Sequence, residues 1–249
     1  MRNLTGQSSR TVTMWVMAFT LVAGSAVLSA AGAGMSSSPL SSLFSRSEQL
    51  REYRALRRMH ASTEKAKHEA WLEAWTELKG GRFSYQIVSE RGSETVRGKV
   101  LRAMLEREEE LVNSGNVDKG DLTPQNYEFG EAARDVDGTR VVQLKPKRND
   151  PLLVEGRAVL NDGGDLVRVE GRLSKNPSFW TSLVNIVRRY ARVGGVRVPV
   201  ATETTAKVKF VGNSQLDVVY EYESVNGRTV AVSELQPAAP AHTAVRSGW

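Results

Sequence analysis

The tetrapeptide Val-Glu-Gly-Arg occurs twice in this chain, at residues 154–157 and again at 169–172. Between the two copies lies Asn161-Asp162-Gly163-Gly164-Asp165, a run typical of a tight turn between two strands. The repeat and its turn therefore predict an antiparallel β-hairpin over residues 152–173.

A turn centred on Gly163-Gly164 fixes which residues of this hairpin face each other. One face then carries two cross-strand charge pairs, which favour the register, and the other face is apolar. The opposed glycines leave room for the close approach of another group, which would be a helix or a ligand. The predicted pairs are Glu155 with Arg172, Arg157 with Glu170, and Gly156 with Gly171, and the apolar face carries Val154, Ala158 and Val169.

Strand patterns continue on both sides of this hairpin, from Tyr127 to about Val225. A second hairpin is predicted at Gly194-Gly195, with Val187 on its apolar side and Arg188 on the other. In that register Arg189 also falls on the apolar side. Either it anchors an anion inside a groove, or the strand contains a β-bulge there.

The first half of the chain predicts helices as well as strands. Ser45 and Glu48 fit a capping box, so a helix is expected over about 46–60, with its arginines on a solvated face. A strand over 68–79 and a hairpin across Lys79-Gly80-Gly81 follow. The clearest helix is expected over about 94–112, where Val96, Val100 and Met104 belong to a broad apolar stripe.

The N-terminal residues have the three parts of an export signal. Arg2 and Arg10 precede an apolar segment from Met14 to Leu28, and Ala31-Gly32-Ala33 resembles a cleavage site. We therefore expect a signal peptide over 1–33, a flexible linker over 34–45, one folded domain over 46–235, and a disordered tail over 236–249. The protein would be exported and periplasmic; the alternative is an inner-membrane anchor formed by an uncleaved N-terminal segment.

The composition excludes several kinds of chemistry. The chain has no Cys and only three His, so it has no disulfide, thiolate zinc site or Cys nucleophile. Neither phosphate-binding glycine loops nor known hydrolase and metalloprotease motifs occur, so we expect no cofactor, no metal site and no catalysis. Cleavage would remove two arginines and lower the net charge from +6 to +4. Because basic and acidic residues alternate along the strands, nucleic acid is not an expected partner.

Three segments resemble an uncharacterised family of exported bacterial proteins: residues 83–93, the paired Val-Glu-Gly-Arg strands, and residues 174–180. That family is similar to the LolA-like superfamily of outer-membrane lipoprotein carriers and sorting proteins. The resemblance implies an α+β fold, with a curved antiparallel sheet forming an unclosed half-barrel whose concave face is covered by helices. It also implies that acyl chains bind on that concave face.

The leading hypothesis is a non-catalytic periplasmic protein that binds lipid or lipoprotein acyl chains and passes them from an inner-membrane complex to an outer-membrane acceptor. One alternative is an envelope structural or stress-sensing protein with a self-filled half-barrel that acts through protein partners. A carboxylate-based hydrolase is a more remote alternative. The expected apolar groove is lined by Val96, Val100, Met104, Val154, Gly156, Ala158, Val169, Gly171, Val187 and Arg189.

Overall fold

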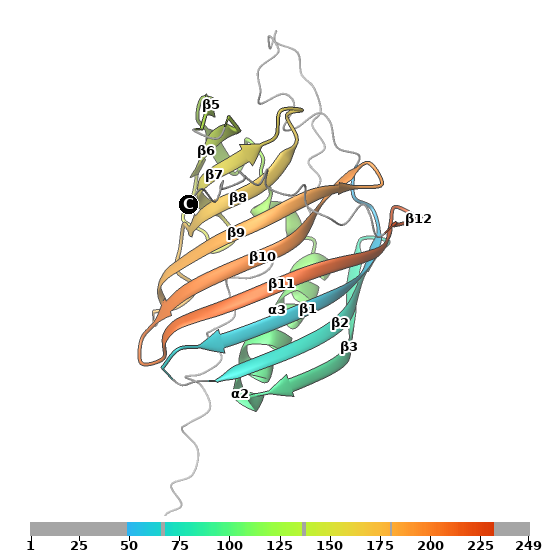
Figure 1. Cartoon of the computed structure of the whole chain (residues 1–249), viewed down its shortest axis with the longest axis vertical. Helices are drawn as coiled ribbons and strands as arrows, with labels where there is room; N and C mark the ends of the chain where they lie inside the picture. The colour runs from blue at the N-terminus through green and yellow to red at the C-terminus, as the bar shows by residue number, and fades with distance from the viewer. Residues whose placement is uncertain (1–48, 66–67, 136–137, 180, 232–249) are drawn as a thin grey trace, which may run out of the picture.

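The computed structural model of the chain describes residues 49–231 except 66–67, 136–137 and 180. The predicted export signal (1–33), linker (34–45) and tail (236–249) lie outside the described residues. Within the described part, one large curved sheet spans the molecule, and the helices lie against one of its faces (Figure 1).

The sheet contains 12 strands, and all of its strand pairs are antiparallel. The main path runs in the order β3-β2-β1-β11-β10-β9-β8-β7-β6-β4, so β3 and β4 are edges and the sheet is not closed. The strands are β1 (Tyr53–Thr63), β2 (Glu69–Lys79), β3 (Arg82–Gly92), β4 (Tyr127–Phe129), β5 (Ala133–Arg134), β6 (Arg140–Pro146), β7 (Val154–Leu160), β8 (Leu166–Leu173), β9 (Thr181–Val193), β10 (Val196–Val208), β11 (Gly212–Val225) and β12 (Arg228–Thr229).

One helical stretch follows β3 and covers the half of the sheet formed by β1 to β3. It consists of α2 (Glu94–Val96), a π-helical segment η1 (Arg97–Arg102) and α3 (Ala103–Asn113), and a short 3-10 turn η2 (Val117–Gly120) comes after it. The helix predicted over 94–112 is confirmed, with a π-helical centre that the pattern did not show. We call the face covered by this stretch the inner face, and the opposite face the outer face. The fold is α+β, as expected.

The helix predicted over 46–60 is wrong, because residues 53–63 form the strand β1. Burial alternates along it: Tyr53, Ala55, Arg57 and Met59 are buried, and the residues between them are not. The helical spacing of Leu50, Tyr53, Leu56 and His60 led to this prediction. Arg57, assigned to the solvated face, points into the core instead. A buried arginine counts as polar in a sequence pattern and so hid the alternation.

The hairpin formed by the two Val-Glu-Gly-Arg copies, which we call the VEGR hairpin, has the predicted register. β7 pairs with β8 so that Glu155 faces Arg172 and Gly156 faces Gly171. Ion pairs join Arg172 to Glu155 at 2.9 Å and Arg157 to Glu170. The hairpins at Gly80-Gly81 and Gly194-Gly195 are confirmed as well, between β2 and β3 and between β9 and β10.

Two separate hydrophobic clusters fill the inner face. The first lies between the helical stretch and strands β1, β2, β3, β10 and β11; Leu72, Leu101 and Met104 are among its buried members. The second lies over β6 to β9, where Val142, Leu144 and Leu160 are buried. The sheet is therefore continuous, whereas its core is divided into two.

A buried ion pair connects the helical stretch to the centre of the first cluster. Arg57 is 1% exposed and Glu108 is 3% exposed. The guanidinium of Arg57 donates to both carboxylate oxygens of Glu108, at 2.5 and 2.7 Å, and to the hydroxyl of Tyr53 at 3.0 Å. Burial is the largest single effect on the pKa of Arg57 and lowers it, but Glu108, Tyr53 and Tyr220 together outweigh burial and hold this pKa above the usual value. The charged run 106–110 predicts the solvated side of this helix, but Glu108 within that run is buried and anchors the helix to the core.

Removing one partner of this pair should destabilise the fold strongly. We expect Arg57→Met to lower the free energy of unfolding by about 3–5 kcal/mol, because Glu108 would remain buried without a counter-charge. The double variant Arg57→Met/Glu108→Leu should recover most of that loss. Urea denaturation monitored by circular dichroism measures the free energy of unfolding of both variants. The exposed Arg58→Met serves as the control and should change the value by less than about 1 kcal/mol; an equal loss in R57M and R58M would contradict this account.

Candidate functional site

The ten residues of the predicted groove do not lie together in one place. Val96 and Met104 are buried in the first hydrophobic cluster, and Val100 packs against it. Val154, Ala158 and Val169 are buried in the second cluster. The remaining four lie in neither cluster. Gly156 and Gly171 belong to the VEGR hairpin, and Val187 and Arg189 belong to β9.

The opposed glycines bring two backbones together and do not make room for a ligand. A Cβ on Gly156 would lie 2.1 Å from the carbonyl oxygen of Glu170, and one on Gly171 would lie 2.2 Å from that of Glu155. Both glycines line an open groove of about 720 Å³ together with the charged residues of the hairpin and Val187. The two ion pairs of the hairpin lie along this groove, and Leu144, Ile186 and Val187 line it as well.

Strand β9 places its two arginines opposite to the first expectation. Arg189 points outward and forms an ion pair with Glu203, so it does not line an apolar groove. Arg188 is 7% exposed on the inner side; its Nη1 lies 3.5 Å from the hydroxyl of Tyr190, and its Nε has no partner among the described residues. The reason is a register shift between Pro199 and Ala201 in the neighbouring strand β10. Of the two alternatives for Arg189, the structure contains the bulge.

A small cavity lies where the two hydrophobic clusters meet, and we call it the seam pocket. Its volume is about 60 Å³. Val96 and Leu216 belong to the first cluster, and Val184 and Ala206 to the second, and all four line this pocket. The rest of the lining includes Val100, Pro177, Thr181, Thr204 and Val208. Two side chains of the lining, Thr204 and Ser214, each have a buried hydroxyl with no hydrogen-bond partner among the described residues. The pocket is therefore mainly apolar, with polar atoms in its wall.

The helix side of this pocket is formed by Val96 of α2 and Val100 of the π-helical segment η1. Arg97 and Arg102, at its two ends, both bind the carboxylate of Glu90 on β3: Arg97 Nη1 at 2.9 Å and Arg102 Nε at 2.9 Å. In an α-helix, residues five apart point about 140° away from each other. In a π-helix the i→i+5 hydrogen bond brings them to one side. The π conformation therefore allows both arginines to bind the same carboxylate. The hydrogen bond from Arg102 lowers the pKa of Glu90.

The outer face of β1 and β2 carries tryptophans that the alternation of the sequence did not assign to a side. The ring of Trp71 stacks on His60 at 4.9 Å, and the guanidinium of Arg91 lies 4.3 Å from its centre. Arg54 lies 4.6 Å from the ring of Trp75. Aromatic and basic side chains therefore meet on this face. Glu223 forms an ion pair with Arg54 at 2.6 Å, and Asp217 Oδ2 lies 3.7 Å from His60 Nδ1.

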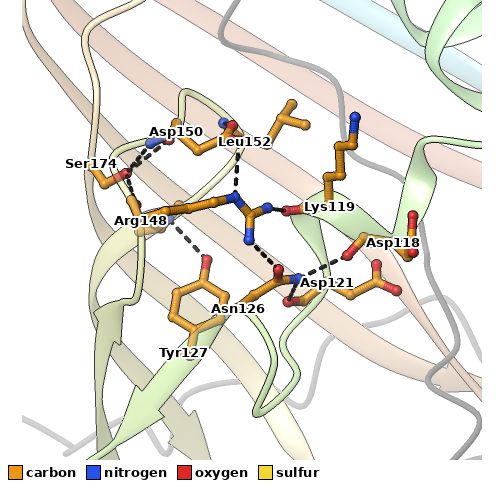
Figure 2. Close-up of polar contacts among 10 residues, drawn as sticks. Asp118, Lys119, Asp121, Asn126, Tyr127, Arg148, Asp150, Leu152 and Ser174 are labelled. Atoms are coloured by element: carbon orange, nitrogen blue, oxygen red, sulfur yellow. Dashed lines mark hydrogen bonds and ion pairs between the residues drawn. The ribbon is translucent and has the colours of Figure 1, made fainter.

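A second polar cluster holds the segment between α3 and β4 against the β6–β7 turn (Figure 2). Arg148 binds Asn126 Oδ1 at 2.5 Å, Asp150 Oδ2 at 3.2 Å and the carbonyl of Lys119. Asn126 in turn donates to the carbonyl oxygens of Asp118 and Asp121, at 2.8 and 2.9 Å. These contacts close the loop over the second hydrophobic cluster.

Asp121 is the titratable group that this loop buries. It is 7% exposed, and its Oδ1 has no partner among the described residues. Burial, reinforced by the negative charge of Asp118, raises the pKa of Asp121 to about 7. In the described part of the chain no group of three or more His, Asp or Glu is arranged to hold a metal ion. Asp121 is therefore the carboxyl of this loop that burial makes harder to ionise.

Comparison with known proteins gives only low similarity. No protein-family model and no curated protein matches the chain. A crystal structure of a DUF1329 family protein from Desulfovibrio piger covers 70% of this chain and 85% of its own, with a TM-score of 0.32 and 12% sequence identity. A likeness this low identifies neither the fold nor the function. No helix within the described ranges is long and apolar enough to cross a membrane.

Adding a methyl group at the glycine pair should test whether these residues are needed for strand packing. We expect Gly156→Ala to lower the free energy of unfolding by about 1–3 kcal/mol, because its Cβ would overlap the backbone of β8. Gly98→Ala is the matched control, since its Cβ meets no atom within 4 Å and helical Ala is favoured over Gly by roughly 0.5–1 kcal/mol. Chemical denaturation of both variants measures the difference. A stable G156A protein would contradict the close approach.

The raised pKa of Asp121 should make stability depend on pH. The folded state binds a proton that the unfolded state releases near pH 4, so stability falls as pH rises from about 4 to 7. Asp121→Asn removes this effect, and its advantage over the natural chain should grow to at most about 4 kcal/mol near pH 8. Urea unfolding at several pH values compares the two proteins. An advantage that does not change with pH would show that Asp121 ionises normally.

Proposed function

We propose that the protein binds the alkyl chain of an amphiphile at the seam pocket, without covalent chemistry. The observation that carries the proposal is the division of the inner core into two clusters with an apolar cavity between them. A cavity at such a boundary can widen by moving one cluster from the other, without breaking either. Val96 and Val100, named from the sequence, line it on the helix side.

The size of the pocket defines what binding requires. About 60 Å³ accommodates only the end of an alkyl chain, so a longer chain must displace the π-helical segment from β9 and β10. Burying about eight methylenes would contribute about 6 kcal/mol, which corresponds to a dissociation constant of tens of micromolar before the cost of that movement. We propose this level of affinity, which suits a carrier that must also release its ligand.

In this proposal the role is that of an exported, periplasmic carrier of lipid or lipoprotein acyl chains. An inner-membrane complex and an outer-membrane acceptor are its proposed partners, in line with the resemblance of its sequence to the LolA-like superfamily. No catalytic step is required, because transfer depends only on burial and release of apolar surface.

A second candidate function is favoured by the small volume of the same pocket. The two clusters fill most of the inner face with the protein's own side chains, as in a half-barrel that holds no ligand and acts through protein partners in the envelope. The two functions differ in one measurable property, namely whether a lipid occupies the interior.

Filling the seam pocket should abolish alkyl-chain binding. We expect the natural chain to bind dansyl-undecanoate with a fluorescence increase, and Val100→Trp to weaken this binding at least about tenfold by occupying the space. Val88→Trp adds the same ring at a side chain that is 55% exposed on β3 and should bind normally. Ala206→Phe, on the opposite wall, is a second filling variant in case V100W does not fold.

Mass spectrometry of an organic extract of the purified protein complements the titration. A stoichiometric lipid supports the carrier function. If the extract holds no lipid and the natural chain does not bind the probe, or if folded filling variants bind it normally, the carrier proposal fails. In the first of these cases the self-filled half-barrel remains.

A further inference from the structure

Apolar side chains are exposed together at one end of the sheet. Phe210 is 85% exposed, Phe179 is 74% exposed and Leu183 is 42% exposed. They come from the β10–β11 turn, the β8–β9 connection and the start of β9, which lie together at the lower left of Figure 1 with the β1–β2 turn. We call the residues 63–65, 174–179, 181–183 and 207–213 the loop end.

Direct contacts hold these segments to one another. The ammonium of Lys209 lies 4.0 Å from the centre of the Phe179 ring. Ser182 Oγ donates to the carbonyl oxygen of Lys207 at 3.2 Å. The backbone N–H of Lys65 donates to the carbonyl of Val211 at 3.2 Å. The exposed rings therefore belong to one connected surface.

The backbone at the tip of this surface is held in an unusual conformation. Phe210 has φ = 69°, and the other non-glycine residue with positive φ in the described part is Asn226. Asparagine tolerates this region, whereas a bulky aromatic residue is an outlier there. The Phe210 ring is 85% exposed in this turn. Strained, exposed positions of this kind are typical of functional surfaces.

The charge of the loop end is positive. Four exposed lysines, Lys65, Lys175, Lys207 and Lys209, lie on it with one exposed acidic residue, Glu64. This differs from the outer face of the strands, where arginines are paired with carboxylates. Exposed aromatic rings surrounded by lysines are the composition of surfaces that bind the interface of an anionic bilayer.

The same end also forms part of the seam pocket. Pro177, Thr181 and Val208 line the pocket and lie in the same segments as the exposed rings. If Phe179 and Phe210 contacted a bilayer, this end of the seam pocket would therefore lie next to the lipid.

We propose that the loop end docks on an anionic lipid bilayer, with Phe179 and Phe210 inserted among the headgroups and the lysines against the lipid phosphates. This inference rests on the proposed function, because it names the membrane as the source of the alkyl chain. Docking requires only the loop end, so docking and alkyl-chain binding can be tested separately.

The absence of cysteine from the chain permits a site-specific test. Asn213→Cys places a label on the loop end, and Thr229→Cys places one on β12, at the opposite end of the sheet (Figure 1). Each full-length variant carries an NBD dye and is mixed with phosphatidylcholine vesicles, with or without about a quarter of phosphatidylglycerol. We expect a blue shift and a rise in NBD fluorescence for N213C with the anionic vesicles only, and no change for T229C. Because the readout is local, attachment through another part of the chain does not imitate it.

Replacing the rings should weaken docking while leaving the fold intact. In the N213C background, Phe179→Ser/Phe210→Asn should raise the vesicle concentration at half-maximal signal at least about tenfold, as expected for loss of inserted apolar side chains. Asparagine suits the positive φ, so the fold is retained. Val88→Ser removes an apolar side chain that is 55% exposed elsewhere and should have no effect.

The outcomes separate docking from alkyl-chain binding. Docking is overturned if the N213C label does not respond, responds equally to vesicles without phosphatidylglycerol, or responds unchanged in F179S/F210N. It is also overturned if the T229C label responds as strongly. Dansyl-undecanoate binding from solution should be unchanged in F179S/F210N. A normal vesicle response in a chain that never binds this probe would refute the proposed function and leave docking in place.

Discussion

The ion pair between Arg57 and Glu108 is the interaction on which the inner face depends. It joins the middle of β1 to the middle of α3 by two hydrogen bonds within the first cluster. The guanidinium also lies 4.8 Å from the ring of Tyr220 and 5.3 Å from that of Phe83, so aromatic faces replace part of its hydration. A buried pair of this kind adds little net stability compared with apolar residues of the same size, but it admits only one placement of the helix. Everything that the helix covers, including the seam pocket, follows from that placement.

The outer face is specified by the opposite kind of electrostatics. Its ion pairs are solvated and run across neighbouring strands; Arg58 binds Glu73 at 3.1 Å on β2 and also Glu221 on β11. Each such pair contributes roughly 0–1 kcal/mol. Their main effect is on register, because a slip of one residue would turn the charges toward the core. The positive charge of the sequence is largely absorbed in these pairs, while the lysines of the loop end are grouped together.

Local patterns were sufficient for the hairpins and insufficient for the packing between them. The glycine turns and the VEGR repeat predicted three hairpins and, at Glu155 and Arg172, the correct cross-strand partners, because turn chemistry and charge pairing are short-range. β1 was missed because Arg57 is a buried charge whose partner is 51 residues away. Arg188 and Arg189 were exchanged because the bulge that shifts them is in the neighbouring strand.

The candidate site was predicted only in part, for a related reason. Val96 and Val100 were identified from the helical stripe, but the opposite wall comes from Pro177, Val184 and Ala206, and no pattern in the sequence shows that β9 and β10 meet the helix there. A pocket at the boundary of two clusters depends on where each cluster ends. That boundary is set by the packing of distant segments.

The two ends of the helical stretch are held with different strength, and this difference decides how the pocket can open. α3 is fixed by the buried pair with Arg57, whose disruption would cost about 3–5 kcal/mol. α2 and η1 are fixed to β3 by Arg97 and Arg102 through Glu90, which are partly exposed at 20%, 32% and 21% of their side chains. Exposed pairs of this type contribute roughly 1 kcal/mol or less. In the proposed opening, the N-terminal part of the helix would lift while α3 stays in place, at the cost of the buried contacts of Val96 and Leu101. Val96 and Val100 lie in the part that would lift, so this movement would enlarge the pocket without breaking the buried ion pair.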